Sequence, residues 1–171
     1  MISVRERLRY IATTINGKEV YVDPEGSHAA THLADTPELL AVVKELLGDL
    51  EVTSENLYLE RDMLRIIGMC DLVETTADDE IIYAKRLNRT NYTRFVKGRS
   101  PQPCSTVTVA LRARKNGSYE LRSAWIGYAV PQFPGDLYET PESKPFWRNH
   151  ALAWGNQAIQ PGTERSSWPW S

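Results

Sequence analysis

Cysteine, histidine and long apolar runs are scarce in this sequence. The first two scarcities argue against a metal site, and the third argues against a membrane span. The two cysteines among the 171 residues, Cys70 and Cys104, show neither CxxC pairing nor zinc-ligand spacing, so a zinc site and a disulfide scaffold are not expected. No apolar run approaches the length of a membrane span, and the N-terminus MISVRERLRY lacks the apolar core of a signal peptide. We therefore expect a cytoplasmic protein with reduced thiols, no metal or other cofactor and no membrane association.

Positive charge is concentrated in one stretch. Residues 85–122 contain ten basic residues and one acid, Glu120, which gives +9, whereas the whole chain has a formal net charge of −2. Such a segment can hold an anion, and Tyr92 and Phe95 lie among the charges as base stacking on a polybasic surface requires. A solvated strand face paired with acids elsewhere explains the charge equally well. The basic residues are Lys85, Arg86, Arg89, Arg94, Lys97, Arg99, Arg112, Arg114, Lys115 and Arg122.

Turn and capping signals predict a hairpin and a helix in the first third of the chain. Asn16-Gly17 joins two short strands within residues 8–22. Thr36 is a suitable helix cap, and Pro37 suits the first helical position. The apolar residues that follow recur at helical spacing as far as Leu47. The sequence therefore predicts one helix that packs a single face on a core.

Strand patterns dominate the middle of the chain. The pattern from Glu55 to Cys70 is ambiguous, and we interpret it as a short helix followed by a turn at Gly68. Alternating or β-rich runs then predict four strands, the last two joined by a turn at Asn116-Gly117. They cover residues 72–75, 81–87, 105–112 and 119–128.

These elements predict an α+β protein with an antiparallel sheet of four or more strands and an N-terminal helix packed on it. We expect a single domain with an N-terminal hairpin arm (1–30), a core (31–130) and a segment rich in proline and tryptophan (131–171). A short helix is expected within residues 146–155, and residues 160–171 are expected to be a loosely held tail.

Metal-independent cleavage of RNA requires residue types that this chain contains. One group must accept the proton of the 2′-OH, another must protonate the leaving oxygen, and cations must stabilise the charge on the phosphate. His32, expected near the start of a helix, suits proton transfer, although a surface or capping role is the commoner one for a histidine. His150, among aromatic residues, is expected to be packed. The basic stretch contains no paired carboxylates of the kind that bind two metal ions.

Four segments together resemble the barnase–EndoU–colicin–RelE (BECR) group of small metal-independent ribonucleases. They span about half of the chain and read HLADTPELL from His32, YAKRLNRTNYTRFVKGR from Tyr83, CSTVTVALRA from Cys104 and YELRSAWIG from Tyr119. Members of the group are often toxins or phage-associated nucleases that cut tRNA or mRNA. The family usually has Thr where Ser123 stands, and the segment after Pro131 has no counterpart.

The resemblance implies an α+β endoribonuclease that cleaves RNA through the 2′-OH, with RNA as partner and, for a toxin, an inhibitory immunity or antitoxin protein. Its implied catalytic residues are His32, Lys85, Arg89 and Ser123. Residues implied or suited by type to contact RNA or phosphate are Arg86, Tyr92, Thr93, Arg94, Lys97, Arg99 and Ser105.

Two other classes remain as alternatives. ADP-ribosyl transfer is suggested by Ser105-Thr106 in a strand, but the Glu-x-Glu or Gln-x-Glu that this chemistry needs is missing. A non-catalytic module is the stronger alternative, because a basic sheet with Tyr92, Phe95 and Trp125 could bind single-stranded nucleic acid without cutting it. A protein-interaction module would use the C-terminal tryptophans as docking residues. Those tryptophans are Trp147, Trp154, Trp168 and Trp170.

Overall fold

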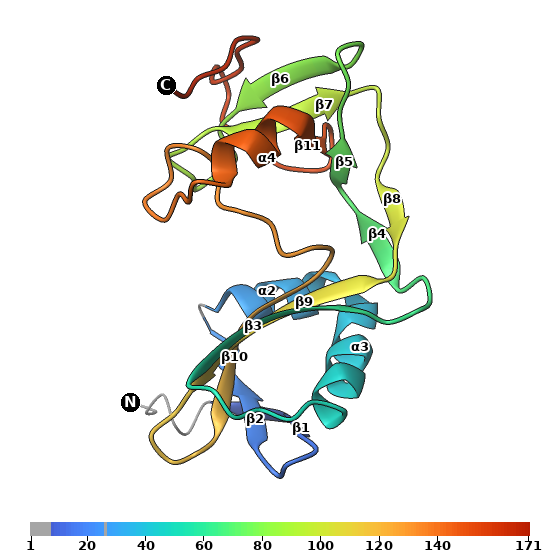
Figure 1. Ribbon diagram of the computed structural model, residues 1–171, viewed down its shortest axis with the longest axis vertical. Helices are drawn as coiled ribbons and strands as arrows, with labels where there is room; N and C mark the ends of the chain where they lie inside the picture. Colours follow the sequence, from blue (N-terminus) through green and yellow to red (C-terminus); the bar gives the residue numbers. More distant parts are fainter. Residues whose placement is uncertain (1–7, 26) are drawn as a thin grey trace. The chain divides into compact units, whose positions relative to one another are not determined.

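The computed structural model describes residues 8–25 and 27–171, and the protein is α+β (Figure 1). The side chain of His28 lies outside the described part. In chain order the elements are β1 (Arg9–Thr13), β2 (Glu19–Val22), α2 (His28–Asp35), α3 (Pro37–Gly48), β3 (Asn56–Asp62), β4 (Gly68–Cys70), β5 (Leu72–Glu74), β6 (Glu80–Ala84), β7 (Thr93–Lys97), β8 (Gln102–Cys104), β9 (Thr106–Ala113), β10 (Tyr119–Ile126), α4 (Ser143–Asn149) and β11 (His150–Ala153). No helix of this described part is long and apolar enough to cross a membrane.

The sheets are mixed, which corrects the expectation of an antiparallel sheet. One five-stranded sheet has the order β1-β2-β10-β9-β3, a four-stranded sheet has the order β5-β11-β7-β6, and β4 pairs with β8. Most pairs are antiparallel, but β2 with β10 and β7 with β11 are parallel. Both parallel pairs join strands that are far apart in the sequence, and the long connections between them make the parallel direction possible.

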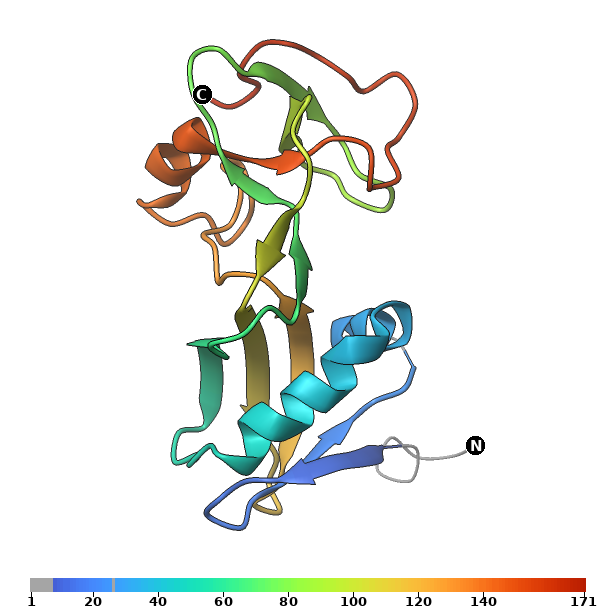
Figure 2. The ribbon, with the colours of Figure 1, turned by 90° about the vertical axis from the view of Figure 1, so that its right-hand side faces the viewer.

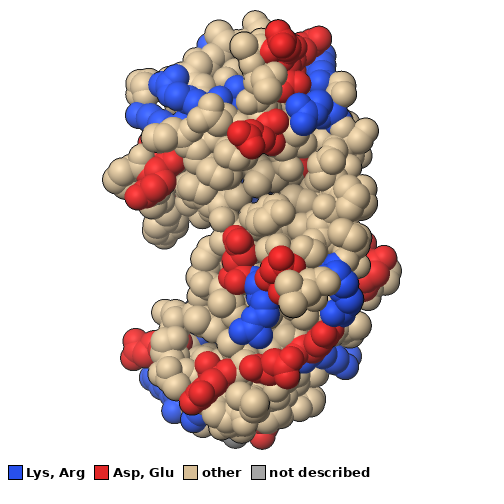
Figure 3. Space-filling model, turned by 45° about the vertical axis from the view of Figure 1, so that its right-hand side comes forward, with Lys and Arg blue, Asp and Glu red and all other residues tan. Residues whose placement is uncertain are grey.

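The chain forms two compact units, each made from two separate segments. Unit 1 comprises Met1–Gly68 and Pro103–Ala129, and unit 2 comprises Met69–Gln102 and Val130–Ser171. These units cut across the expected core of residues 31–130, which contributes to both. The basic stretch is divided as well, since its residues up to Arg99 belong to unit 2 and those from Arg112 onward to unit 1. On the face drawn in Figure 3, basic and acidic side chains are interspersed within each unit.

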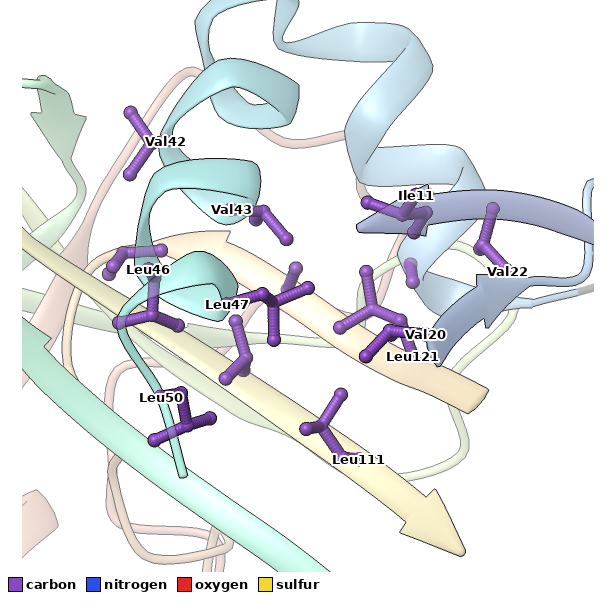
Figure 4. Packing of buried hydrophobic residues seen from close by; sticks show 14 of the residues in the cluster. Ile11, Val20, Val22, Val42, Val43, Leu46, Leu47, Leu50, Leu111 and Leu121 are labelled. Carbon is purple, nitrogen blue, oxygen red and sulfur yellow. The ribbon is translucent and has the colours of Figure 1, made fainter. Parts of the chain in front are cut away.

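Unit 1 is built on the helix α3, which crosses one face of the five-stranded sheet (Figure 2). Pro37 stands at the helix start, and Leu39, Val43 and Leu47 are fully buried on one face. They share a hydrophobic cluster with alternate residues of the strands, such as Leu121 (Figure 4). The helical and strand periodicities therefore meet in one core, as the sequence indicates for residues 36–47 and 105–128.

One local expectation is wrong, and one helix has no predicted counterpart. The segment 55–70 contains the strands β3 and β4 rather than a short helix, and in β3 Leu57 and Leu59 face the core while Tyr58 between them is 56% exposed, which is a two-residue period. Residues 28–35 form the helix α2 ahead of the expected one. Its cap is Ser27, whose side chain accepts a hydrogen bond from the backbone N–H of Ala30.

Unit 2 contains the C-terminal segment as an integral part. The helix expected within residues 146–155 is α4, but it ends at Asn149, and the chain continues as β11 between β5 and β7. Trp147 is fully buried, and Trp170, near the end of the chain, is 8% exposed. The residues expected to be a loosely held tail are therefore packed on this unit.

Candidate nucleic-acid interface

The implied site residues are divided between the two units. Unit 1 holds His32, Ser105 and Ser123, and the remaining residues lie in unit 2. The four implied catalytic residues therefore do not come together within one unit, because Lys85 and Arg89 belong to unit 2. The unit 2 residues are Lys85, Arg86, Arg89, Tyr92, Thr93, Arg94, Lys97 and Arg99.

The three implied site residues of unit 1, His32, Ser123 and Ser105, lie in three different local settings. His32 lies in the last turn of α2, not at a helix start, and its backbone carbonyl accepts the N–H of Thr36. Ser123 is half-buried on β10, next to an irregularity in the pairing of β10 with β9. The side chain of Ser105 binds the Asp62 carboxyl group. The pKa of Asp62 is lowered first by the backbone N–H of Leu64 and then by this serine.

Three cations of unit 2 are committed to partners within it. Arg94 is buried, and it donates to the Tyr83 hydroxyl at 3.2 Å and to the carbonyl oxygen of His150 at 2.9 Å. Lys97 pairs with Glu80 at 3.7 Å, and Arg99 pairs with Asp79 at 3.1 Å. Arg94 therefore holds neighbouring strands together, and its burial leaves it poorly placed to meet a phosphate at the surface.

The basic loop, Lys85–Tyr92, connects β6 to β7. Its cations Lys85, Arg86 and Arg89 have no ion-paired acid among the residues that the structure describes. A pocket of about 250 Å³ is lined by this loop on one side and by the segment Gln132–Asp136 on the other. Arg86 and Arg89 both line it, together with the amide side chains of Asn88 and Asn91. One acid, Asp136, also belongs to the lining. The pocket therefore presents two positive charges and one negative charge.

Arg86 is held in place by neutral groups. Its Nε donates to the Thr93 hydroxyl at 2.9 Å, and its Nη1 donates to Oε1 of Gln157 at 3.3 Å. Gln157 in turn donates to Asp71 at 3.4 Å, so the nearest carboxylate in this chain of bonds is one residue removed. Burial lowers the pKa of Arg86, and the like charge of Arg89 lowers it further. An anion bound beside the guanidinium would offset both effects.

The aromatic residues of the basic stretch do not present free stacking faces. Lys85 Nζ lies 5.1 Å from the centre of the Tyr92 ring, and the Arg165 guanidinium lies 5.5 Å from it. Phe95, expected to stack on bases, is fully buried and packs edge-to-face on Trp154. Phe133 stacks on Trp147 with ring centres 3.9 Å apart. Cations rather than open aromatic rings therefore dominate the surface of the basic loop.

Sequence reasoning missed the residues of the C-terminal segment that hold the basic loop. The Gln160 side-chain amide donates to the carbonyl oxygens of Arg86 at 3.0 Å and Arg89 at 2.7 Å. The backbone N–H of Gln160 donates to the carbonyl oxygen of Lys85. Arg165 adds a fourth cation beside Tyr92. No local signal in the sequence connects residues about 75 positions apart.

His150 is packed, as the sequence predicts. Its ring stacks on Phe146 with centres 4.0 Å apart, and its Nδ1 lies 2.9 Å from the carbonyl oxygen of Phe146.

A second pocket, of about 420 Å³, lies in unit 1 between the turns at Lys18 and Asn116, and none of the implied site residues lines it. Across residues 8–25 and 27–171 no three His, Cys, Asp or Glu side chains are grouped to hold a metal ion.

Comparisons with protein-family models, with curated proteins and with solved structures each gave no match for this chain. The resemblance to the BECR group therefore stays a prediction from four sequence segments.

Proposed function

We propose that this protein binds RNA through the basic loop (Lys85–Tyr92) of unit 2. The observation that carries the proposal is a group of cations on one loop and its C-terminal support, for which the described part of the chain provides no ion-paired acid. Lys85, Arg86 and Arg89 come from the loop, and Arg165 joins them beside Tyr92. Phosphate contacts dominate the affinity of proteins for nucleic acids, and the surface of this loop offers cations rather than base-stacking rings.

Binding of this kind has a measurable salt dependence. If the four cations each neutralise one phosphate, the log–log slope of affinity against salt for single-stranded RNA should be about −0.7 per contact, or about −3 in total. The assay is fluorescence anisotropy with a short labelled RNA at several salt concentrations.

A pair of double variants separates specific contacts from total charge. Arg86→Gln with Arg89→Gln should weaken binding for every RNA sequence and make the salt slope shallower by about 1.4. Arg112→Gln with Lys115→Gln removes the same charge from the same basic stretch, but from exposed positions in unit 1. The control should retain nearly all affinity. Equal losses in both variants, or an affinity that salt does not change, would remove the proposed interface.

The second candidate function is metal-independent endoribonuclease activity on the bound RNA, as in the toxins and phage-associated enzymes of the BECR group. The observation that favours it is the pair Arg86 and Arg89 in one pocket, because two guanidinium groups can stabilise the charge that develops on a phosphate during cleavage. The proposed substrate is cytoplasmic tRNA or mRNA. The resemblance implies His32 as the proton-transfer residue and Lys85, Arg89 and Ser123 as the other catalytic groups, and of these four Lys85 and Arg89 lie in unit 2 with the basic loop.

Cleavage is tested by incubating purified protein with total tRNA and with mRNA in EDTA. Attack by the 2′-OH should leave 2′,3′-cyclic phosphate or 3′-phosphate ends, and DNA should bind but stay intact. His32→Ala should lower the cleavage rate by about a hundredfold or more while affinity stays unchanged. If RNA stays intact and no inhibitory protein co-purifies, the enzyme proposal fails and RNA binding alone stands. If His32→Ala cleaves at the normal rate, proton transfer belongs to another residue.

A further inference from the structure

The guanidinium of Arg86 is only partly satisfied by the protein. An arginine side chain has five N–H donors in a fixed plane. Two hydrogen bonds of Arg86 involve protein acceptors, the Thr93 hydroxyl and the Gln157 side-chain oxygen. Three donors therefore have no acceptor among the described residues. Because the side chain lines a pocket, those donors and the nearby Arg89 define a place for an acceptor that residues 8–25 and 27–171 do not supply.

The surroundings of these donors restrict the acceptor. A half-buried guanidinium binds oxyanions with two parallel hydrogen bonds, and a second guanidinium favours a doubly charged one. The pocket is lined by the basic loop together with Phe133 and Asp136. An internal phosphodiester would bring neighbouring phosphates on both sides, and one of them would approach the carboxylate of Asp136. A phosphate at the end of a strand avoids this repulsion on one side and carries the second negative charge.

We infer that the pocket between Arg86, Arg89 and Asp136 is a binding site for the terminal phosphate monoester of an RNA strand. This inference rests on the proposed RNA binding and adds the part of the RNA that the pocket selects. The ligand chemistry is the same for a 5′-phosphate and a 3′-phosphate, and both ends are compared below.

Gln160 is the positioning residue of this site. Its side-chain amide bonds the carbonyl oxygens of Arg86 and Arg89, which are the two residues whose guanidinium groups face the pocket. These bonds fix the backbone at both cationic positions, so the two side chains keep a constant starting geometry. Gln160→Met keeps the length and removes the donor, and it should reduce the preference for a terminal phosphate more than the affinity for RNA in general.

The experiment measures the affinity of the whole protein for four labelled oligonucleotides of one sequence with 2′-O-methyl sugars, which cannot be cleaved through the 2′-OH. They carry no terminal phosphate, a 5′-phosphate, a 3′-phosphate, or both. At least one monophosphorylated oligonucleotide should bind about tenfold more tightly than the one without, as expected for charge-assisted hydrogen bonds to a single group. Inorganic phosphate should compete for this added affinity.

Variants assign the preference to the pocket. Arg86→Gln and Arg89→Gln should each abolish most of the preference for a terminal phosphate. Because Arg89 is exposed, Arg89→Gln tests the pocket while it leaves the hydrogen bonds of Arg86 intact. Arg112→Gln should retain it. Equal affinity for all four oligonucleotides with a normal salt slope overturns this inference and leaves RNA binding in place. A preference that survives both pocket variants also overturns it. An absence of binding to every oligonucleotide removes the proposed function itself.

Discussion

Trp170 should be one of the main contributors to the stability of unit 2, although it is the penultimate residue of the chain. Its ring is 8% exposed, meets Tyr83 edge-on with ring centres 5.5 Å apart, and lies 6.2 Å from the ring of Phe133. Its indole N–H donates to the Asn91 side chain at 2.9 Å. Truncation of a buried Trp to Ala typically costs about 3–5 kcal/mol. Trp170→Phe keeps most of the ring and removes the hydrogen bond, so it should cost about 1 kcal/mol plus a smaller packing loss.

The assay is urea unfolding followed by tryptophan fluorescence. Four of the five tryptophans, all except Trp125, lie in unit 2, so the signal reports mainly on that unit. Tyr138→Ala is the control, because Tyr138 is 73% exposed in the same unit and its loss should change the free energy of unfolding by less than about 0.5 kcal/mol. A cost below about 1 kcal/mol for Trp170→Ala would show that the C-terminal segment is loosely held, and the support of the basic loop by this segment would fail with it.

Two further predictions concern the core of unit 1 and the loss of folding stability at acid pH. Leu47→Ala should lower the free energy of unfolding by about 2–5 kcal/mol because Leu47 is fully buried. Leu40→Ala in the same helix should cost much less because Leu40 is 39% exposed, and urea unfolding followed by circular dichroism compares the two variants. The pKa of Asp79 is lowered mainly by the backbone N–H of Thr76 and also by Arg99, so its stabilising effect is present above the unfolded pKa of about 3.9 and is lost as the pH falls through the lower folded pKa. Asp79→Asn should therefore be less stable than the wild type at pH 7, and the two stabilities should converge on acidification; a constant difference down to pH 2 would contradict this assignment.

Elements with strong local signals could be predicted from the sequence. The helix beginning at Pro37 starts and ends where the sequence predicts, and most of its predicted apolar face is buried. Two details differ, since the Thr36 side chain makes no capping hydrogen bond and Leu40 is 39% exposed. The hairpin turns at Asn16-Gly17 and Asn116-Gly117 also lie where the sequence predicts them, with both glycines at positive φ. In each case the information lies within about 12 neighbouring residues, which is the range over which a single sequence can be interpreted.

Pairings between distant segments could not be predicted in this way. β11 lies between β5 and β7, although about 75 residues of sequence separate it from β5 and about 50 from β7, and its four residues carry no strong strand signal. The helix of residues 28–35 has no predicted counterpart, and it depends on the Ser27 cap and on packing against β10. Tertiary packing decides such short elements more than propensity does.

Charge counted along the chain is a poor guide to charge in space, and the basic stretch illustrates the physical reason. Its residues from Arg112 onward lie on the hairpin of β9 and β10 in unit 1, whereas Arg94 is buried in unit 2 with neutral partners. What remains is the basic loop, and its geometry depends on Gln160 and Arg165, which lie outside the stretch. The proposed phosphate site is therefore discontinuous in sequence. A peptide of residues 85–122 would keep the charge and lose the site, so only the folded chain can distinguish specific recognition from general attraction to a polyanion.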